Sequence, residues 1–134
     1  MRLKQTRVRN FILRTRTTTK DREGAPIVTY GAPKTVRGEI WPATSRKQVE
    51  QYGDRISGIQ NMRLEGDYKI SDDGQGITVT FSDGTLLKPG DGIHVFRPYE
   101  VLTLGSDLAY TDPDYYVLSI TQYYPLKLEV EALV

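Results

Sequence analysis

Short runs in which hydrophobic and polar residues alternate make up most of the chain, and a period of two residues is typical of a half-buried β-strand. Ile77, Val79 and Phe81 alternate with polar residues, and residues 126–132 repeat the pattern. Glycine and proline turns separate the runs. The pattern predicts about eight short strands, bounded by such turns, with no internal repeat.

The order of the runs predicts a series of hairpins. A β-branched, threonine-rich stretch, residues 6–18, is expected to pair with residues 27–30 across a polar turn at residues 20–26. Residues 36–41 follow as a third strand. Further strands are expected at 93–96, 101–104, 115–123 and 126–132, with a loop at 105–114 and with Pro98 limiting pairing beside it. In residues 115–123, Tyr116, Leu118 and Ile120 are expected on one face, and the last two strands close a hairpin.

A separate hairpin insertion is predicted at about residues 66–92. Its central strand is the Ile77–Phe81 alternation, and Asp83 and Gly84 form a tight turn because glycine readily adopts positive φ. Leu86 and Leu87 follow that turn. We expect this insertion to protrude from the main sheet.

Residues 37–66 contain the one clear helix signal. Ser45 is a predicted N-cap and Gln48, three residues later, completes a capping box, while Gly53 suits the helix stop. A helix of about two turns is marginal in water, so it must pack on the rest of the protein. Trp41, which precedes it, is expected in the core.

Together these elements predict an all-β, mainly antiparallel fold: a small β-barrel with one short helix and a hairpin insertion. A sandwich has the same strand content, but closing the barrel removes exposed edges. The 134 residues suit a single domain, 1–134. There are no cysteines, no segment of about 18 apolar residues and no signal-peptide pattern, so we expect no disulfide, no membrane span and a cytoplasmic site of synthesis.

Charge is distributed unevenly although the net charge is only +1. Residues 1–20 contain seven lysines or arginines and no acid, whereas residues 98–134 contain six acids and, as their one basic residue, Lys127. The basic segment suits phosphate contacts with nucleic acid or an acidic patch on a second copy of the chain. An edge strand protected by arginine and threonine explains it equally well.

Residues for catalysis or metal binding are few. His94 is the only histidine and has no nucleophile motif beside it, so a structural role is expected. Asp72 and Asp73 begin like a calcium loop without the later ligands, and Asp112 and Asp114 suit turn formation. No phosphate-binding glycine motif occurs. The sequence therefore predicts a protein that is not an enzyme and has no cofactor.

Two tyrosine pairs, Tyr115–Tyr116 and Tyr123–Tyr124, raise the question of base stacking. Strand alternation places one member of each pair toward the core and the other outward. Outward tyrosines are also common at protein interfaces, which is the interpretation favoured here.

The order of features resembles the head–tail joining or head-closure (stopper) proteins of long-tailed bacteriophages and prophages. The residues that carry the resemblance are Phe11–Thr15, Asp21–Pro26, the strand Gly38–Ala43 with Trp41, the polar segment Ser45–Glu50, the extended segment 54–64, and the ending made of 88–93, Tyr115–Ile120 and Leu126–Val130. The insertion at 66–92 is longer than the family pattern. The resemblance implies a β-barrel that assembles as a homo-oligomeric ring in the virion neck, monomeric when free. There it would contact the portal or adaptor, the tail and packaged DNA.

Two sets of residues follow as candidates on this interpretation. A docking or gating segment, mobile in the free subunit and ordered on docking, comprises Ser45, Arg46, Lys47, Gln48, Val49, Glu50, Tyr52 and Arg55. A subunit interface, in which residues 1–20 of one copy face residues 126–134 of the next, comprises Arg7, Arg9, Arg14, Glu129, Glu131, Tyr115 and Tyr123.

Two other functions remain open on the sequence. A tail-completion or minor capsid protein would have the same size and strand content. An oligonucleotide-binding barrel would use a basic, aromatic face to bind single strands.

Overall fold

A closed, six-stranded antiparallel barrel forms the centre of the protein and confirms the predicted fold class. A computed structural model of the chain describes residues 8–72, 74, 76–96, 101–104 and 107–133. The barrel order is β1-β4-β5-β13-β12-β9, and pairing of β9 with β1 closes it. The barrel strands are β1 (Arg9–Arg14), β4 (Lys34–Pro42), β5 (Ile59–Leu64), β9 (Gly92–His94), β12 (Tyr115–Thr121) and β13 (Leu126–Ala132).

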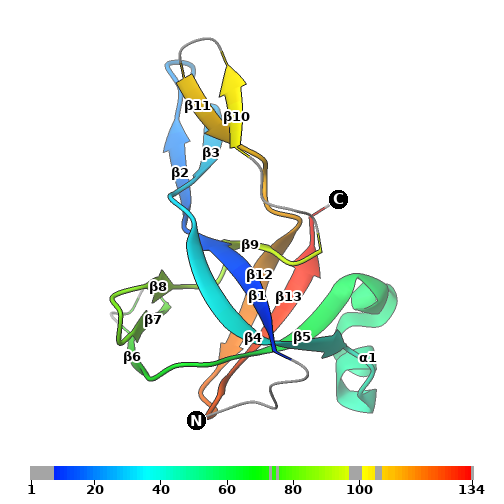
Figure 1. The fold of residues 1–134 in the computed structure, drawn as a ribbon. Helices are drawn as coiled ribbons and strands as arrows, with labels where there is room; N and C mark the ends of the chain where they lie inside the picture. The colour runs from blue at the N-terminus through cyan, green and yellow to red at the C-terminus, as the bar shows by residue number, and fades with distance from the viewer. Residues whose placement is uncertain (1–7, 73, 75, 97–100, 105–106, 134) are drawn as a thin grey trace.

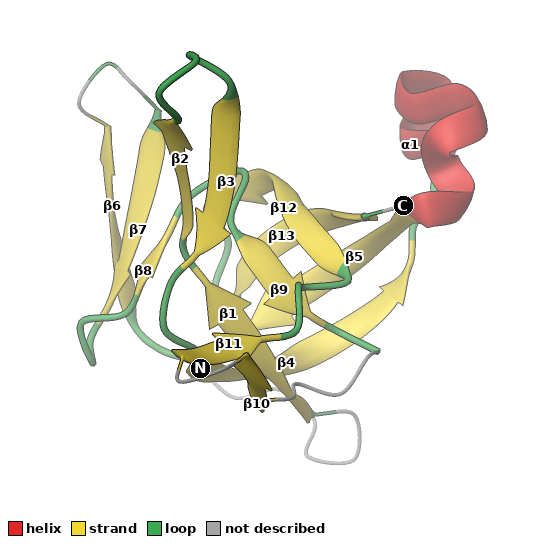
Figure 2. Ribbon diagram, turned by 90° about the horizontal axis from the view of Figure 1, so that it is seen from above, coloured by secondary structure: helices red, strands yellow, loops and turns green. Residues whose placement is uncertain are grey.

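Three small sheets are attached to the barrel. A ribbon of β2 (Arg16–Lys20) and β3 (Pro26–Tyr30) and a second ribbon of β10 (Val101–Leu104) and β11 (Asp107–Tyr110) both leave the same end of the barrel (Figure 1). A three-stranded sheet contains β6 (Tyr68–Asp72), β7 (Ile77–Phe81) and β8 (Leu86–Leu87). Seen from above, this sheet and the helix lie on different sides of the barrel (Figure 2).

The insertion shares the barrel core. Val79 and Leu87 are fully buried, and they belong to one continuous hydrophobic cluster with barrel residues such as Phe11, Met62 and Leu128. This burial gives the insertion the apolar support that an isolated hairpin lacks. The predicted 66–92 element is therefore a third sheet packed against the barrel, and only part of it protrudes.

Close packing in the barrel wall requires a glycine at one position where β4 pairs with β5. Gly38 pairs with Leu64 of β5, and a Cβ at Gly38 would lie 2.1 Å from the carbonyl oxygen of Arg63. No side chain fits at that distance. Gly38 thus lets β4 approach β5 closely.

The predicted helix begins and ends where its caps place it. Helix α1 (Arg46–Tyr52) has Ser45 as N-cap, and the Ser45 hydroxyl accepts the Gln48 backbone N–H at 3.2 Å. The Ser45 hydroxyl also donates to the Gln48 side-chain oxygen at 3.1 Å, in place of the backbone bond of a full capping box. Gly53 ends the helix with φ of 56°. A 3-10 helix, η1 (Gly53–Gly58), continues to β5.

Several sequence expectations need correction. Residues 6–18 divide at Thr15 into β1 and β2, because the carbonyl of Thr15 turns to accept the N–H of Gly31 at 2.7 Å. The expected loop at 105–114 contains β11, which pairs with β10. Trp41 is only half-buried, since its position in β4 points away from the barrel interior. The effect of Pro98 on pairing concerns residues outside the described part of the chain.

The predicted face of β12 is wrong because the strand contains a bulge. The pairing of β12 with β13 shifts between Val117 and Ser119. Val117 is 1% exposed and faces the core, and after the bulge Ile120 packs against the same cluster. One extra residue therefore reverses the alternation within the strand.

Candidate functional site

The segment α1–η1 lies on the outer wall of the barrel and is held there by polar side chains. Gln48 is 7% exposed. Its amide nitrogen donates to Asn61 Oδ1 of β5 at 2.6 Å and to Glu129 Oε2 of β13 at 2.8 Å. Ser119 of β12 donates to the other oxygen of Glu129 at 2.7 Å. A side chain of the helix is thus bonded to a row of polar residues that crosses three barrel strands.

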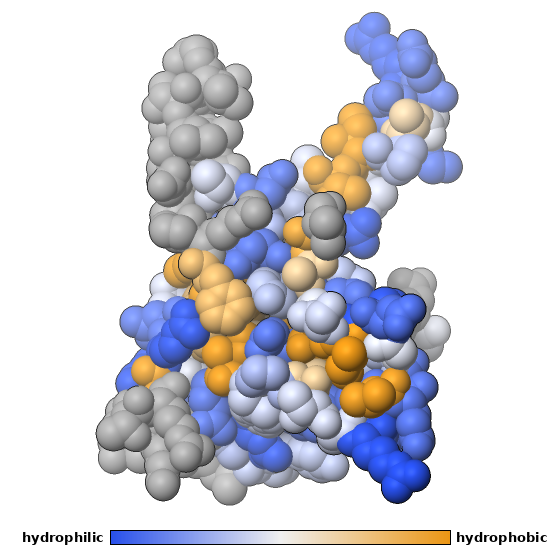
Figure 3. Space-filling model, turned by 90° about the vertical axis from the view of Figure 1, so that its right-hand side faces the viewer, coloured by the Kyte–Doolittle hydropathy of each residue, from blue (hydrophilic) through white to orange (hydrophobic). Residues whose placement is uncertain are grey.

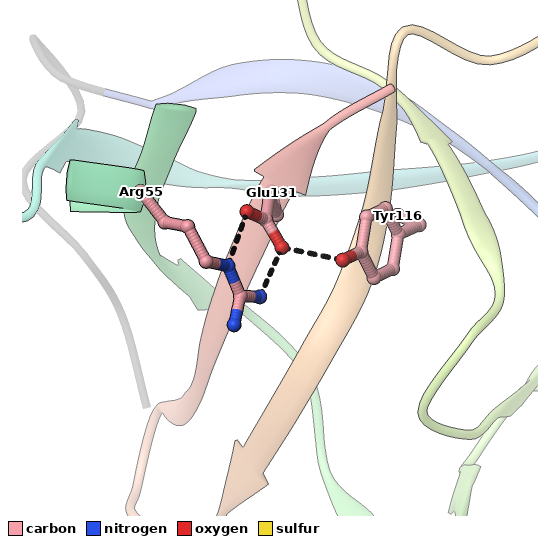
Figure 4. A network of polar contacts seen from close by, with 3 residues as sticks. All are labelled: Arg55, Tyr116 and Glu131. Carbon is pink, nitrogen blue, oxygen red and sulfur yellow. Dashed lines mark hydrogen bonds and ion pairs between the residues drawn. The ribbon is translucent and has the colours of Figure 1, made fainter. Parts of the chain in front are cut away.

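A second anchor holds η1. Arg55 Nε donates to Glu131 Oε2 at 3.0 Å and Arg55 Nη2 donates to Glu131 Oε1 at 2.5 Å, and the Tyr116 hydroxyl donates to the same carboxylate (Figure 4). The Arg55 guanidinium also lies 5.7 Å from the centre of the Tyr52 ring. A two-point arginine–carboxylate contact fixes orientation as well as distance.

The two glutamates are held in their ionised form. Burial raises the pKa of Glu129, but hydrogen bonds from Ser119, Gln48 and Tyr52 outweigh it, so the pKa is lower than usual. The hydrogen bond from Arg55 is the largest cause of the lowered pKa of Glu131. Burial, with the Glu129 hydrogen bond, raises the pKa of Tyr52 to about 12. The two carboxylates are therefore ionised near neutral pH.

The candidate docking segment has two faces. Gln48, Tyr52 and Arg55 point to the barrel and hold the segment in place. The other face is exposed: Arg46 and Glu50 form an ion pair at 3.4 Å with side chains 94% and 69% exposed, Val49 is 47% exposed, and Lys47 is also exposed. This outer set is available to a partner while the segment is docked, as are the exposed N-cap residue Ser45 and the exposed part of the Arg55 side chain.

The basic side chains proposed for a subunit interface are largely used within the subunit. Arg14 is 4% exposed, and its guanidinium donates to the carbonyls of Gly31, Thr111 and Tyr30 at 3.0, 2.7 and 3.2 Å. The Arg14 guanidinium is therefore enclosed by its own subunit, which leaves little of it exposed to a neighbouring copy. Arg9 donates to the Val95 carbonyl at 3.1 Å and lies 5.4 Å from two phenylalanine ring centres. Arg7 lies outside the described residues.

The acidic and aromatic members of that set differ in availability. The carboxylates of Glu129 and Glu131 bind their own helix segment, so they are not free to pair with the basic segment of a neighbour. Tyr115 is half-buried, packs against the core and lies edge-on to Phe96, with ring centres 5.7 Å apart. Tyr123 is 48% exposed and remains accessible.

The second tyrosine pair does not alternate as predicted. Tyr124 is 56% exposed, as accessible as Tyr123, because both residues lie in the turn after β12. Tyr124 stacks on Tyr68 with ring centres 5.0 Å apart, and Arg63 lies 5.3 Å from the Tyr123 ring centre. The turn therefore presents an aromatic and basic cluster at one end of the barrel.

Two buried carboxylates fix the loops around β9. The sequence does not identify either of them as an anchor between distant segments. Asp91 is 1% exposed and accepts the backbone N–H groups of Arg16 and Lys88 at 3.1 and 3.0 Å. Asp114 accepts the N–H groups of Val95 and Phe96 at 2.7 and 2.8 Å. His94 is buried beside them, and burial lowers its pKa.

Among the described residues, no group of three histidine or carboxylate side chains is arranged to hold a metal ion. Neither helix in the described part of the chain is long and apolar enough to cross a membrane. The chain matched no protein-family model, no curated protein and no solved structure.

Proposed function

We propose that the protein is a structural head–tail connector of a bacteriophage or prophage, of the head-closure (stopper) type. In this role several copies form a ring in the virion neck, below the portal and its adaptor. The ring retains packaged DNA and provides the surface on which the tail docks. The subunit is made in the host cytoplasm and works without a cofactor.

The observation that carries the proposal is the placement of α1–η1. In the chain this segment connects β4 to β5, which are paired neighbours in the barrel. The segment lies on the outer wall with a charged face exposed. The order of strand, short polar helix and extended strand is the part of the sequence that resembles the head-closure family. The small barrel and the outward face of Arg46, Lys47, Val49 and Glu50 support a role in binding other proteins.

The polar anchors refine the idea that the segment is mobile in the free subunit. Gln48 and Arg55 bond to Glu129 and Glu131, which supports a segment that is docked on the barrel in the isolated subunit. We propose that a partner in the neck first contacts the exposed face of α1. Release from the barrel then requires breaking the Gln48–Glu129 hydrogen bond and the two-point Arg55–Glu131 ion pair, contacts that an unattached loop does not have.

Deletion of the gene in the phage that encodes the chain tests the role directly. A head-closure protein is needed after packaging, so the deletion should yield heads that have lost their DNA together with complete, unattached tails. DNA-filled heads with defective tails would indicate tail completion instead. Normal infectious particles would contradict a connector role.

A second function is favoured by one specific feature, the cluster of Tyr123, Tyr124, Tyr68 and Arg63 at the barrel end. Exposed aromatic rings beside a cation are typical of surfaces that bind single-stranded nucleic acid. Fluorescence anisotropy with single-stranded DNA at two salt concentrations tests it. Tight binding that weakens with salt and is lost in Tyr123→Ala/Tyr124→Ala would favour the nucleic-acid function over the connector.

A further inference from the structure

A hollow of about 430 Å³ lies where the β2–β3 ribbon leaves the barrel. Val28 of the ribbon and Leu133 at the end of the chain supply apolar surface, and they are 42% and 39% exposed. Tyr30 and Tyr116 complete the apolar lining. Figure 3 shows hydrophobic surface at the foot of this ribbon, on the side that faces right in Figure 1. Exposed apolar side chains that converge in a concave surface suit a binding partner.

The hollow also contains one charge of each sign. Arg16 and Asp112 both line it. The backbone N–H of Arg16 binds Asp91, but within the described residues no hydrogen bond or ion pair joins the Arg16 guanidinium or the Asp112 carboxylate to another group. An apolar patch flanked by one charge of each sign fits a protein segment that brings an apolar side chain and both complementary charges.

The insertion presents a segment with that composition. Leu86 in the edge strand β8 is 50% exposed, while its neighbour Leu87 is fully buried. Asp83 and Lys88, on either side of Leu86 in the chain, are both exposed. Strand β8 pairs with β7 alone, so its other edge has no strand partner in the described structure.

The two surfaces face different directions. In Figure 1, β8 lies at the left of the barrel, whereas β13, the strand that precedes Leu133, ends at the right. A projecting surface and a matching hollow on different sides of one subunit form a heterologous contact, which produces a ring when the rotation between neighbours closes.

We propose that Leu86 of one subunit enters the hollow of the next copy of the same chain. Leu86 then contacts Val28 and Leu133, with Asp83 close to Arg16 and Lys88 close to Asp112. This contact replaces the pairing of residues 1–20 with residues 126–134 as the ring interface. The inference rests on the proposed function, because it assigns the subunit contact of the proposed ring.

Disulfide trapping tests the contact, since the chain has no cysteine of its own. Leu86→Cys and Leu133→Cys are made as two separate proteins, mixed at high concentration and oxidised mildly. We expect a disulfide-linked heterodimer in the mixture and little dimer in either protein alone. In the double variant Leu86→Cys/Leu133→Cys, the expected product is a ladder of oligomers on a non-reducing gel.

A charge exchange provides an independent arm. Lys88→Glu and Asp112→Lys should each weaken self-association by about tenfold or more, because each places like charges together, and the double variant should restore most of it. Glu23→Arg, an exposed acid in the β2–β3 turn, is the control and should leave self-association unchanged. Sedimentation velocity measures all four proteins.

The possible failures are distinguishable. Rings seen by electron microscopy without the Leu86–Leu133 disulfide and without charge rescue would overturn this interface and leave the connector function standing. Homodimers of Leu86→Cys alone would also overturn it, because they indicate a symmetric contact between two β8 edges. No ring in solution or in isolated necks would overturn the interface and the proposed function together.

Discussion

Arg55 and Glu131 are joined at two points, with Nε to Oε2 at 3.0 Å and Nη2 to Oε1 at 2.5 Å, although 76 positions separate them in the chain. The contact ties η1 to the last strand of the barrel. Together with Gln48 and Glu129, it makes the attachment of the helix segment polar and charge-dependent, so the segment is held by specific bonds more than by apolar burial.

Loss of the Arg55–Glu131 contact should loosen the segment without unfolding the barrel. In Arg55→Met the two hydrogen bonds to Glu131 are removed, and we expect amide hydrogen exchange to become faster across residues 46–58 and to stay unchanged in β5 and β13. Arg46→Met is the matched control, because Arg46 pairs with Glu50 on the exposed face. Equal protection of residues 46–58 in both variants would contradict the assigned anchor.

The buried amide of Gln48 should contribute more than its exposed neighbours. Gln48→Ala leaves the polar groups of Asn61 and Glu129 short of one partner in a mostly buried place, which costs about 1–3 kcal/mol of unfolding free energy. Lys47→Ala, at an exposed position of the same helix, should change it by less than about 0.5 kcal/mol. Urea unfolding measures both. A cost for Gln48→Ala no larger than for Lys47→Ala would show that the network does not anchor the helix.

Acid should release the helix segment. The folded-state pKa values of Glu129 and Glu131 lie below the ordinary glutamate value of about 4.3. Between the two values the unfolded chain binds more protons than the folded chain, so the two glutamates stabilise the fold fully only above about pH 4.3. This contribution is lost as pH falls from about 4.3 through the lower folded-state pKa values. Asp91 has the opposite effect on the pH dependence of stability, because burial raises its pKa in the folded state.

The measurement is hydrogen exchange of residues 46–58 as a function of pH, corrected for the intrinsic exchange rate. Protection should decrease below about pH 4 in the natural chain. In the double variant Glu129→Gln/Glu131→Gln, protection should be lower at neutral pH and nearly independent of pH. The same acid dependence in both proteins would rule out these two glutamates as its source.

The close approach of β4 and β5 gives a prediction for the barrel itself. Gly38→Ala places a Cβ 2.1 Å from the Arg63 carbonyl oxygen and should destabilise the fold by about 3 kcal/mol. Gly58→Ala is the control, because its Cβ would meet Ala132 at 4.0 Å. Thermal unfolding compares them. Similar melting temperatures would mean that the strands separate more easily than the barrel geometry implies.

The sequence predicted elements whose signal is local. The Ser45 cap, the Gly53 stop and the alternation of Ile77, Val79 and Phe81 were read correctly, because each depends on neighbouring residues. The predicted face of β12 is wrong, because the bulge after Val117 depends on how β12 pairs with β13. Residue type alone predicts Trp41 in the core, whereas its strand position directs it outward.

The site was predicted only in part, because its members are brought together by register between distant strands. The sequence predicts the capped helix of the candidate docking segment, but Asn61, Ser119 and Tyr116, which hold it through Gln48, Glu129 and Glu131, carry no local signal. The burial of Arg14 was missed for the same reason. Its three carbonyl partners come from β3, the following turn and Thr111, which meet only in the folded barrel.

The central claim is that copies of this chain form a ring in the neck between head and tail. Electron microscopy of necks isolated from the particles that the phage produces tests it most directly. The account predicts a closed ring of this barrel between the portal complex and the tail, with the β8 edge of each subunit against the next subunit's Val28–Leu133 hollow. Necks that lack the chain, or single copies placed elsewhere in the particle, would contradict it.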